Sequence, residues 1–262
     1  TIGGAVYVAV GATTTVGITD STFSENTCDG GGGAVWVQGD FLHLSMADCT
    51  IENNTTGDND IVGSDGGAVV IRDWASVDIA TTTFADNSTG QGGGALLIDN
   101  TDVLSATAFI RDCQFEGNVA AGGAGGALGF DALQGDIASL SLRSSTFIDN
   151  ESYSGGGGAQ VSNPTAVLVE DCWFSGNSAG GNGGGALEIA DWDSIEISDT
   201  SFATNHSTNC GGALTIGAPA IDAGIAKVDQ TLFDGTSCDL DAGALYVNYS
   251  SPNAISARVS AP

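Results

Sequence analysis

The chain has 262 residues, of which 42% are hydrophobic and 40 are glycine, and its 32 acidic and 5 basic residues give a formal net charge of −27. An apolar fraction of this size excludes a disordered linker, and so negative a surface excludes nucleic acid as a partner because the phosphates would be repelled. No apolar run reaches the length of about 18 residues that a membrane-spanning helix needs, so no transmembrane segment is predicted.

The first predicted element belongs to a motif that returns along the whole chain. Two small residues, an alanine and an apolar residue occur first at residues 3–6 and recur at intervals of 27 to 34 residues. Each copy opens a short strand, and a fixed motif at such a period is typical of a repeat protein in which every copy forms one structural unit. The alanines of the nine copies are Ala5, Ala34, Ala68, Ala95, Ala127, Ala159, Ala186, Ala213 and Ala244.

A second and a third strand follow within each repeat. The second alternates apolar and polar residues, as at Val16 and Ile18, and the third carries the motif Phe-x-x-Asn, first at Phe23 and Asn26. Both patterns have the two-residue period of strands, and no helical period is present. Further copies of the third motif are Phe84/Asn87, Phe115/Asn118, Phe147/Asn150, Phe174/Asn177 and Phe202/Asn205, with imperfect copies at Ile51/Asn54 and Phe233/Thr236.

Three strands per repeat predict an all-β fold, a right-handed single-stranded parallel β-helix (a solenoid) of about eight and a half coils. Residues one repeat apart then stack in columns, with phenylalanine on phenylalanine and with inward apolar residues one and three places after each alanine. The asparagine of the third motif is expected to be left-handed and to hydrogen-bond to the asparagines of neighbouring coils. We expect residues 1–262 to form a single domain, either a segment of a longer solenoid or a fibre subunit.

The pairing of Phe-x-x-Asn with Gly-Gly-Ala-Val, as at residues 23–26 and 32–35, resembles the repeats of the polymorphic membrane proteins of chlamydiae and related β-helix repeats of other bacteria. The resemblance extends over nearly the whole chain. It implies a β-helix and a surface-exposed protein, typically an adhesin, that lies outside the cell or on its surface.

The cysteines fall into two groups by their place in the repeat. Cys49, Cys113 and Cys172 lie two residues before the phenylalanine position in alternate coils. Alternate coils are ~9.6 Å apart, beyond the ~7 Å reach of a disulfide, so these three are predicted to be buried thiols. Cys210 and Cys238 lie in the same turn of neighbouring coils, so a disulfide between them is one interpretation and two free thiols are the other.

The residue two places after the alanine is expected to face outward. In the first four coils this residue is Tyr7, Trp36, Val70 or Leu97. An exposed apolar stripe ~14 Å long would be a contact surface for a partner. The alternative is that the neighbouring turn folds over the stripe and covers it.

One acidic segment is a candidate metal site. Asp58, Asp60 and Asp65 provide hard oxygen ligands at a spacing that suits calcium. The segment lacks the full signature of a calcium loop, and turn formation is the alternative role for these side chains. Calcium is therefore the single candidate cofactor.

The chain is predicted not to be an enzyme. A lyase acting on an acidic polysaccharide needs basic residues to bind carboxylates and stabilise the intermediate, and five scattered bases cannot form such a cleft. We expect an extracellular structural or adhesive protein whose partners are other protein chains, either copies of itself or proteins on a host or cell surface, or glycans. A head-to-tail fibre subunit is the alternative function, and a polysaccharide-active enzyme is the weaker one.

Overall fold

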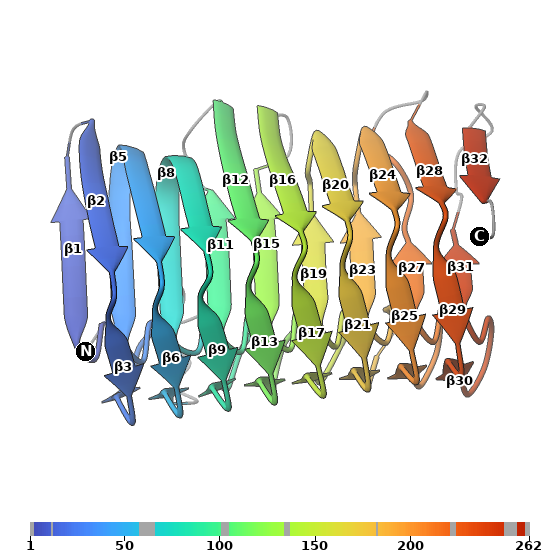
Figure 1. The fold of residues 1–262 in the computed structure, drawn as a ribbon, viewed down its shortest axis with the longest axis horizontal. Coiled ribbons are helices and arrows are strands. Elements are labelled where there is room, and N and C mark those ends of the chain that lie inside the picture. Colours follow the sequence, from blue (N-terminus) through green and yellow to red (C-terminus); the bar gives the residue numbers. More distant parts are fainter. Residues whose placement is uncertain are drawn as a thin grey trace.

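The structure is a computed structural model that describes residues 3–11, 13–57, 66–100, 105–133, 137–181, 183–220, 224–248 and 256–259. Its strands stack along one axis from β1 (Val6–Val10) to β32 (Ser256–Val259), so the molecule is a rod with its termini at opposite ends (Figure 1). In the described part of the chain every regular element is a strand, and no helix is present that could cross a membrane.

The strands form three parallel sheets, as predicted for a β-helix. The largest has 16 strands and contains two strand columns, because β5 (Val35–Ala47) and β8 (Val69–Ala80) run through a bend that joins them. The column that follows the glycines continues with β11 (Leu96–Asn100), β15 (Leu128–Ala132), β19 (Ala159–Ser162), β23 (Leu187–Ala190), β27 (Leu214–Ile216) and β31 (Leu245–Val247). The alternating column contains β2 (Thr14–Thr19), β12 (Ser105–Arg111), β16 (Ile137–Arg143), β20 (Ala166–Glu170), β24 (Ser194–Ser198), β28 (Ile225–Asp229) and β32.

Each of the other two sheets has eight strands. The phenylalanine motif forms β3 (Thr22–Ser24), β6 (Thr50–Glu52), β9 (Thr83–Ala85), β13 (Gln114–Glu116), β17 (Thr146–Ile148), β21 (Trp173–Ser175), β25 (Ser201–Ala203) and β29 (Leu232–Asp234). A two-residue strand that the sequence did not indicate follows each asparagine and, in the last copy, Thr236: β4 (Thr27–Cys28), β7 (Thr55–Thr56), β10 (Ser88–Thr89), β14 (Val119–Ala120), β18 (Glu151–Ser152), β22 (Ser178–Ala179), β26 (His206–Ser207) and β30 (Ser237–Cys238). Eight stacked strands enclose seven intervals, so the rod completes about seven turns between them, slightly fewer than predicted.

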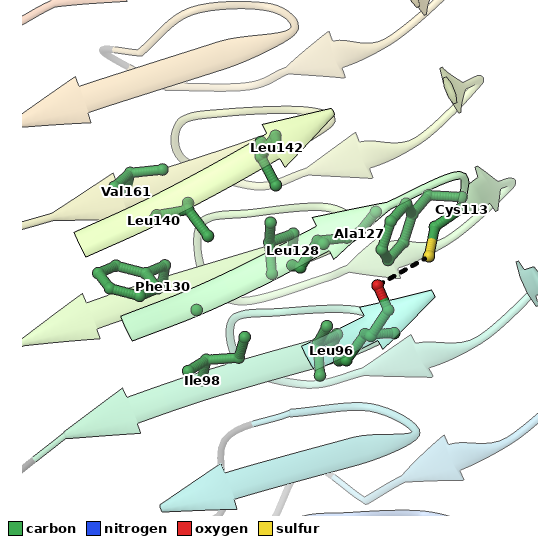
Figure 2. Close-up of a cluster of buried hydrophobic side chains, with 14 of the residues drawn as sticks. Leu96, Ile98, Cys113, Ala127, Leu128, Phe130, Leu140, Leu142 and Val161 are labelled. Carbon is green, nitrogen blue, oxygen red and sulfur yellow. Dashed lines mark hydrogen bonds between the residues drawn. The ribbon is translucent and has the colours of Figure 1, made fainter. Parts of the chain in front are cut away.

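The core runs the length of the rod between the strand columns. Leu128 and Phe130 of β15 face Leu140 and Leu142 of β16, and all four side chains are at most 1% exposed (Figure 2). Because side chains alternate between the two faces of a strand, one member of every pair of neighbours enters this core. The predicted inward positions one and three places after the alanine are therefore confirmed, except in the sixth repeat, where Gln160 follows Ala159 on the outward side.

Two columns of side chains hold neighbouring coils together inside the rod. The phenylalanine rings from Phe84 to Phe233 stack with centroids 4.6–5.2 Å apart and planes within 12° of parallel. From Asn54 to Asn205 the asparagines of the motif are fully buried, and each Oδ1 accepts hydrogen bonds from both the backbone N–H and the Nδ2 of the asparagine one coil earlier, as Asn150 does from Asn118. The predicted stacking and asparagine ladder are thus confirmed.

The turns correct one detail of that prediction. The left-handed residue is not the asparagine but the residue before it, as at Asp149 with φ of 52°. A second left-handed position precedes the small residue of the cysteine column, as at Asp112 with φ of 55°. Aspartate and glycine are common at these positions because both tolerate positive φ.

The register corrects the alignment of the sixth repeat. Gly158, not Ala159, stands in the alanine column, because its N–H donates to the carbonyl of Ala186 and its carbonyl accepts from the N–H of Ala127. Ala159 pairs with Leu128 and so begins the strand. The outward residue of this coil is therefore Gln160, which pairs with Gly129.

Candidate functional site

The apolar stripe predicted to face solvent is covered along most of its length. Trp36, Val70 and Leu97 are 3%, 0% and 7% exposed and form a second hydrophobic cluster outside the main core. Tyr7 in the first coil is the exception, with 50% of its surface exposed. The prediction of an exposed contact stripe is therefore wrong for three of its four residues.

The glycine-rich turns cover the stripe. Cβ atoms added to Gly32 and Gly93 would lie 3.3 Å and 3.2 Å from the Cβ atoms of Trp36 and Leu97. In addition, the guanidinium of Arg72 lies over the Trp36 ring, 4.8 Å from its centroid. The turns thus fold over the outward side chains of the stripe, as the alternative interpretation of the sequence proposed.

The other predicted site residues are not brought together. Cys210 and Cys238 are free thiols in the structure, which corresponds to the second of the two interpretations, and Cys238 pairs in register with Ser207 rather than with Cys210. The candidate calcium ligands Asp58, Asp60 and Asp65 lie outside the described residues. Within the described part of the chain, no three His, Cys, Asp or Glu side chains gather in a way that could hold a metal ion.

Cys49, Cys113 and Cys172 lie where the sequence placed them, in a buried column of small residues. Each thiol donates to the carbonyl two residues earlier, at 3.1 Å from Cys49 to Ala47 and 3.2 Å from Cys113 to Arg111. Burial raises the pKa of Cys113 to about 11 and of Cys172 to about 12. Both therefore remain protonated thiols at neutral pH and act as packing residues.

The surface that is exposed to solvent lies on the alternating strand column and not on the covered stripe. The strands β12, β16, β20, β24 and β28 lie side by side across the front of the rod (Figure 1), and we call the surface formed by their outward side chains the open face. Their outward positions align in register, with Phe109 beside Ser141 and Leu168 beside Glu196. Within the described part of the chain, no turn folds over these positions as the glycine-rich turns fold over Trp36.

The open face carries large apolar side chains around a groove. Phe109, Ile137 and Ile225 are 49%, 62% and 60% exposed, and a groove of about 470 Å³ runs between Phe109 and Ile225. Small residues such as Ser141 and Ala166 line the groove and leave the space that larger side chains would fill. Four coil intervals separate its ends, a length of ~19 Å.

The charges on the open face are balanced, unlike those of the chain as a whole. Three of the five bases lie here, each paired with a carboxylate of a neighbouring strand at 3.2 Å or less. The register of the parallel strands brings two of these pairs side by side, whereas Asp78 lies beside Phe109, two residues before Arg111. The pairs are Arg111–Asp78, Arg143–Glu170 and Lys227–Glu196, with Asp229 also 3.9 Å from Lys227.

Sequence reasoning missed the open face although a signal for it was present. The alternating strands were identified, but their outward residues were not compared between coils. That comparison places Arg111 beside Arg143 and Phe109 beside Ser141. Basic residues at the same position of neighbouring coils, together with an aromatic residue on the solvent side of a half-buried strand, would have indicated a candidate binding surface on this side of the rod.

One comparison with known proteins agrees with the fold. The model of the Chlamydia polymorphic membrane protein (Chlamydia_PMP) repeat matches residues 20–38, which run from the turn before β3 through β4 into β5. This segment contains one phenylalanine motif and one glycine motif. No curated protein and no solved structure matches the chain. The match covers one repeat, and together with the parallel β-helix of the described chain it supports repeats of the polymorphic membrane protein type.

Proposed function

Because these repeats are of the polymorphic membrane protein type, we propose that the chain is a rod-shaped part of a surface protein and that it acts by adhesion. In this proposal the open face, not the covered stripe, contacts a protein on the surface of another cell. The observation that carries the proposal is the exposure of Phe109, Ile137 and Ile225 on a face with paired charges. Apolar patches bordered by polar residues are typical of protein contact sites.

The charge of the chain favours a partner other than a second copy. Two rods of formal charge −27 repel each other as they approach, whereas a neutral or basic partner is not repelled. The paired charges of the open face leave little repulsion once the surfaces meet. The fibre alternative requires contacts between strongly acidic copies and is less well supported for this reason.

A polysaccharide-active enzyme is less consistent with this face. The groove lies on regular strands, and its charged residues are already paired, as Lys227 is with Glu196 at 2.8 Å. A catalytic carboxylate or base must be available to substrate atoms. We therefore propose a binding role for the groove.

Adhesion itself is tested with beads that carry the purified chain. We expect coated beads to remain on cultured animal cells after washing, and soluble chain in excess to release them. Because apolar burial rather than charge drives the proposed contact, retention should change less than about threefold between 50 and 500 mM salt. Retention no greater than for albumin-coated beads, or retention that disappears in high salt, would contradict the proposal.

A further inference from the structure

A second pocket lies away from the open face, where the covered stripe ends. The stripe column continues from Leu97 through Gly129, Gln160 and Glu188 to Thr215. Gly129 has no side chain to fill the column, and the next two residues are polar. The apolar cover found over Leu97 thus gives way to a hollow with polar walls.

The hollow is a pocket of about 430 Å³. Its lining includes Tyr153, Ser154, Gln160 and Glu188, together with three glycines. Tyr153 is 69% exposed, so its ring stands free at the pocket. The pocket therefore combines one carboxylate, one amide, two hydroxyls and the aromatic ring that carries one of them.

The backbone around Glu188 leaves space for its carboxylate. Cβ atoms added to Gly155 or Gly183 would overlap Oε2 of Glu188. Only glycine at these two positions therefore allows the side chain to lie where it does. The side chain is half-buried, and this burial raises the pKa of Glu188 to about 7.

The carboxylate has no partner among the described residues. None of them donates a hydrogen bond to Glu188 or forms an ion pair with it. The four bases whose side chains the structure describes pair with other carboxylates. The titratable groups that face Glu188 are Tyr153 in the pocket and Cys210 of the next coil, which has Cys238 and Asp241 beside it, and none of these is a cation.

We propose that this pocket binds a single organic cation, the ammonium or guanidinium group of a lysine or arginine side chain on a partner polypeptide. A half-buried carboxylate gains most from a ligand that supplies the missing positive charge. A cation can also bind over the face of the Tyr153 ring, and Gln160 offers a further acceptor. Calcium requires six to eight oxygen ligands, and one carboxylate with one amide does not provide them.

The site is separate from the open face and does not depend on adhesion. The test adds Nα-acetyl-lysine amide or Nα-acetyl-arginine amide, each with its charged side chain intact, to the full chain. Binding is measured by the shifts of the amide NMR signals of Gly155 and Gly181. We expect saturable shifts with both probes and none with N-acetyl-glutamine amide or calcium chloride. Shifts of equal size with the neutral probe, or saturation by calcium alone, would overturn the proposal.

Variants and pH locate the effect at Glu188. Glu188→Gln keeps the shape of the side chain and should weaken binding about tenfold or more, whereas Glu151→Gln, an exposed acid in the adjacent coil, should not change it. Tyr153→Ala should weaken binding about threefold. With a pKa of about 7, the charged fraction of Glu188 falls about tenfold per pH unit below 7, so affinity at pH 5 should be about a hundredth of that at pH 8. Binding by Glu188→Gln at wild-type strength, or no change with pH, would overturn the proposal, while loss of adhesion alone would not.

Discussion

Replacing Gly126 by alanine is expected to lower the free energy of unfolding by more than about 4 kcal/mol. A Cβ at this position would overlap the carbonyl oxygen of Gly157 in the next coil and lie 2.6 Å from the carbonyl oxygen of Glu151. Both obstacles are backbone atoms held by the sheets, so they cannot move aside as a flexible side chain could. The coils would have to separate locally, which breaks the ladder that joins them.

The second glycine has the same surroundings in other inner repeats, and this explains the motif. At Gly94 and Gly185, as at Gly126, an added Cβ would overlap the carbonyl of the corresponding glycine one coil further on. Urea unfolding followed by circular dichroism measures the effect. Gly17→Ala is the matched control, because nothing lies within 4 Å of a Cβ added there, and we expect it to be neutral or slightly stabilising. Equal urea midpoints for Gly126→Ala and Gly17→Ala would show that close backbone approach is not the reason for glycine at this position of the repeat.

Replacing Asn150 by alanine should lower the free energy of unfolding by about 3–9 kcal/mol. Its Oδ1 accepts from the N–H and the Nδ2 of Asn118, both at 3.0 Å, and its Nδ2 donates to Asn177 Oδ1 at 2.9 Å and to the carbonyl of Phe115 at 3.1 Å. The variant loses all four bonds. Two donors of Asn118 and the carbonyl of Phe115 then remain buried without these partners, and each such group costs about 1–3 kcal/mol.

The control for this variant is its neighbour in the chain. Glu151 is exposed at the start of β18, so Glu151→Ala should change stability by less than about 0.5 kcal/mol. The comparison by urea unfolding separates loss of the ladder from a general effect of substitution in this coil. An Asn150→Ala midpoint as high as that of Glu151→Ala would show that the ladder contributes little to stability.

Much of the fold could be predicted because each coil repeats the same strand patterns and the same inward residues. The alternation at Leu140 and Leu142 indicated a half-buried strand, and the recurring Phe-x-x-Asn placed one ring above another. Parallel in-register stacking then required the asparagine ladder. The two-residue strands after each asparagine were missed because two residues carry no periodic pattern.

The candidate sites could not be predicted from the pattern of a single strand, because they depend on the turns that cover a strand and on the register between coils. Trp36 follows the outward alternation of its strand, but its exposure is decided by the glycine-rich turn that folds over it. Because the sixth repeat was aligned on Ala159, its outward position two residues later fell on Val161 and not on Gln160, which concealed the polar pocket around Glu188. A one-residue slip exchanges the two faces of a strand, so the pocket could be recognised only after the register was known.

The most direct test of adhesion through the open face compares the binding of monomeric fluorescent chain to cells for two variants. Phe109→Ser with Ile225→Ser removes both exposed ends of the groove, and Leu232→Ser, which is 49% exposed on another sheet, is the matched control. We predict that the double variant loses about tenfold or more in apparent affinity because exposed apolar anchors carry much of the binding energy, while the control binds as the wild type does. Equal binding by all three proteins would contradict the assignment of adhesion to the open face.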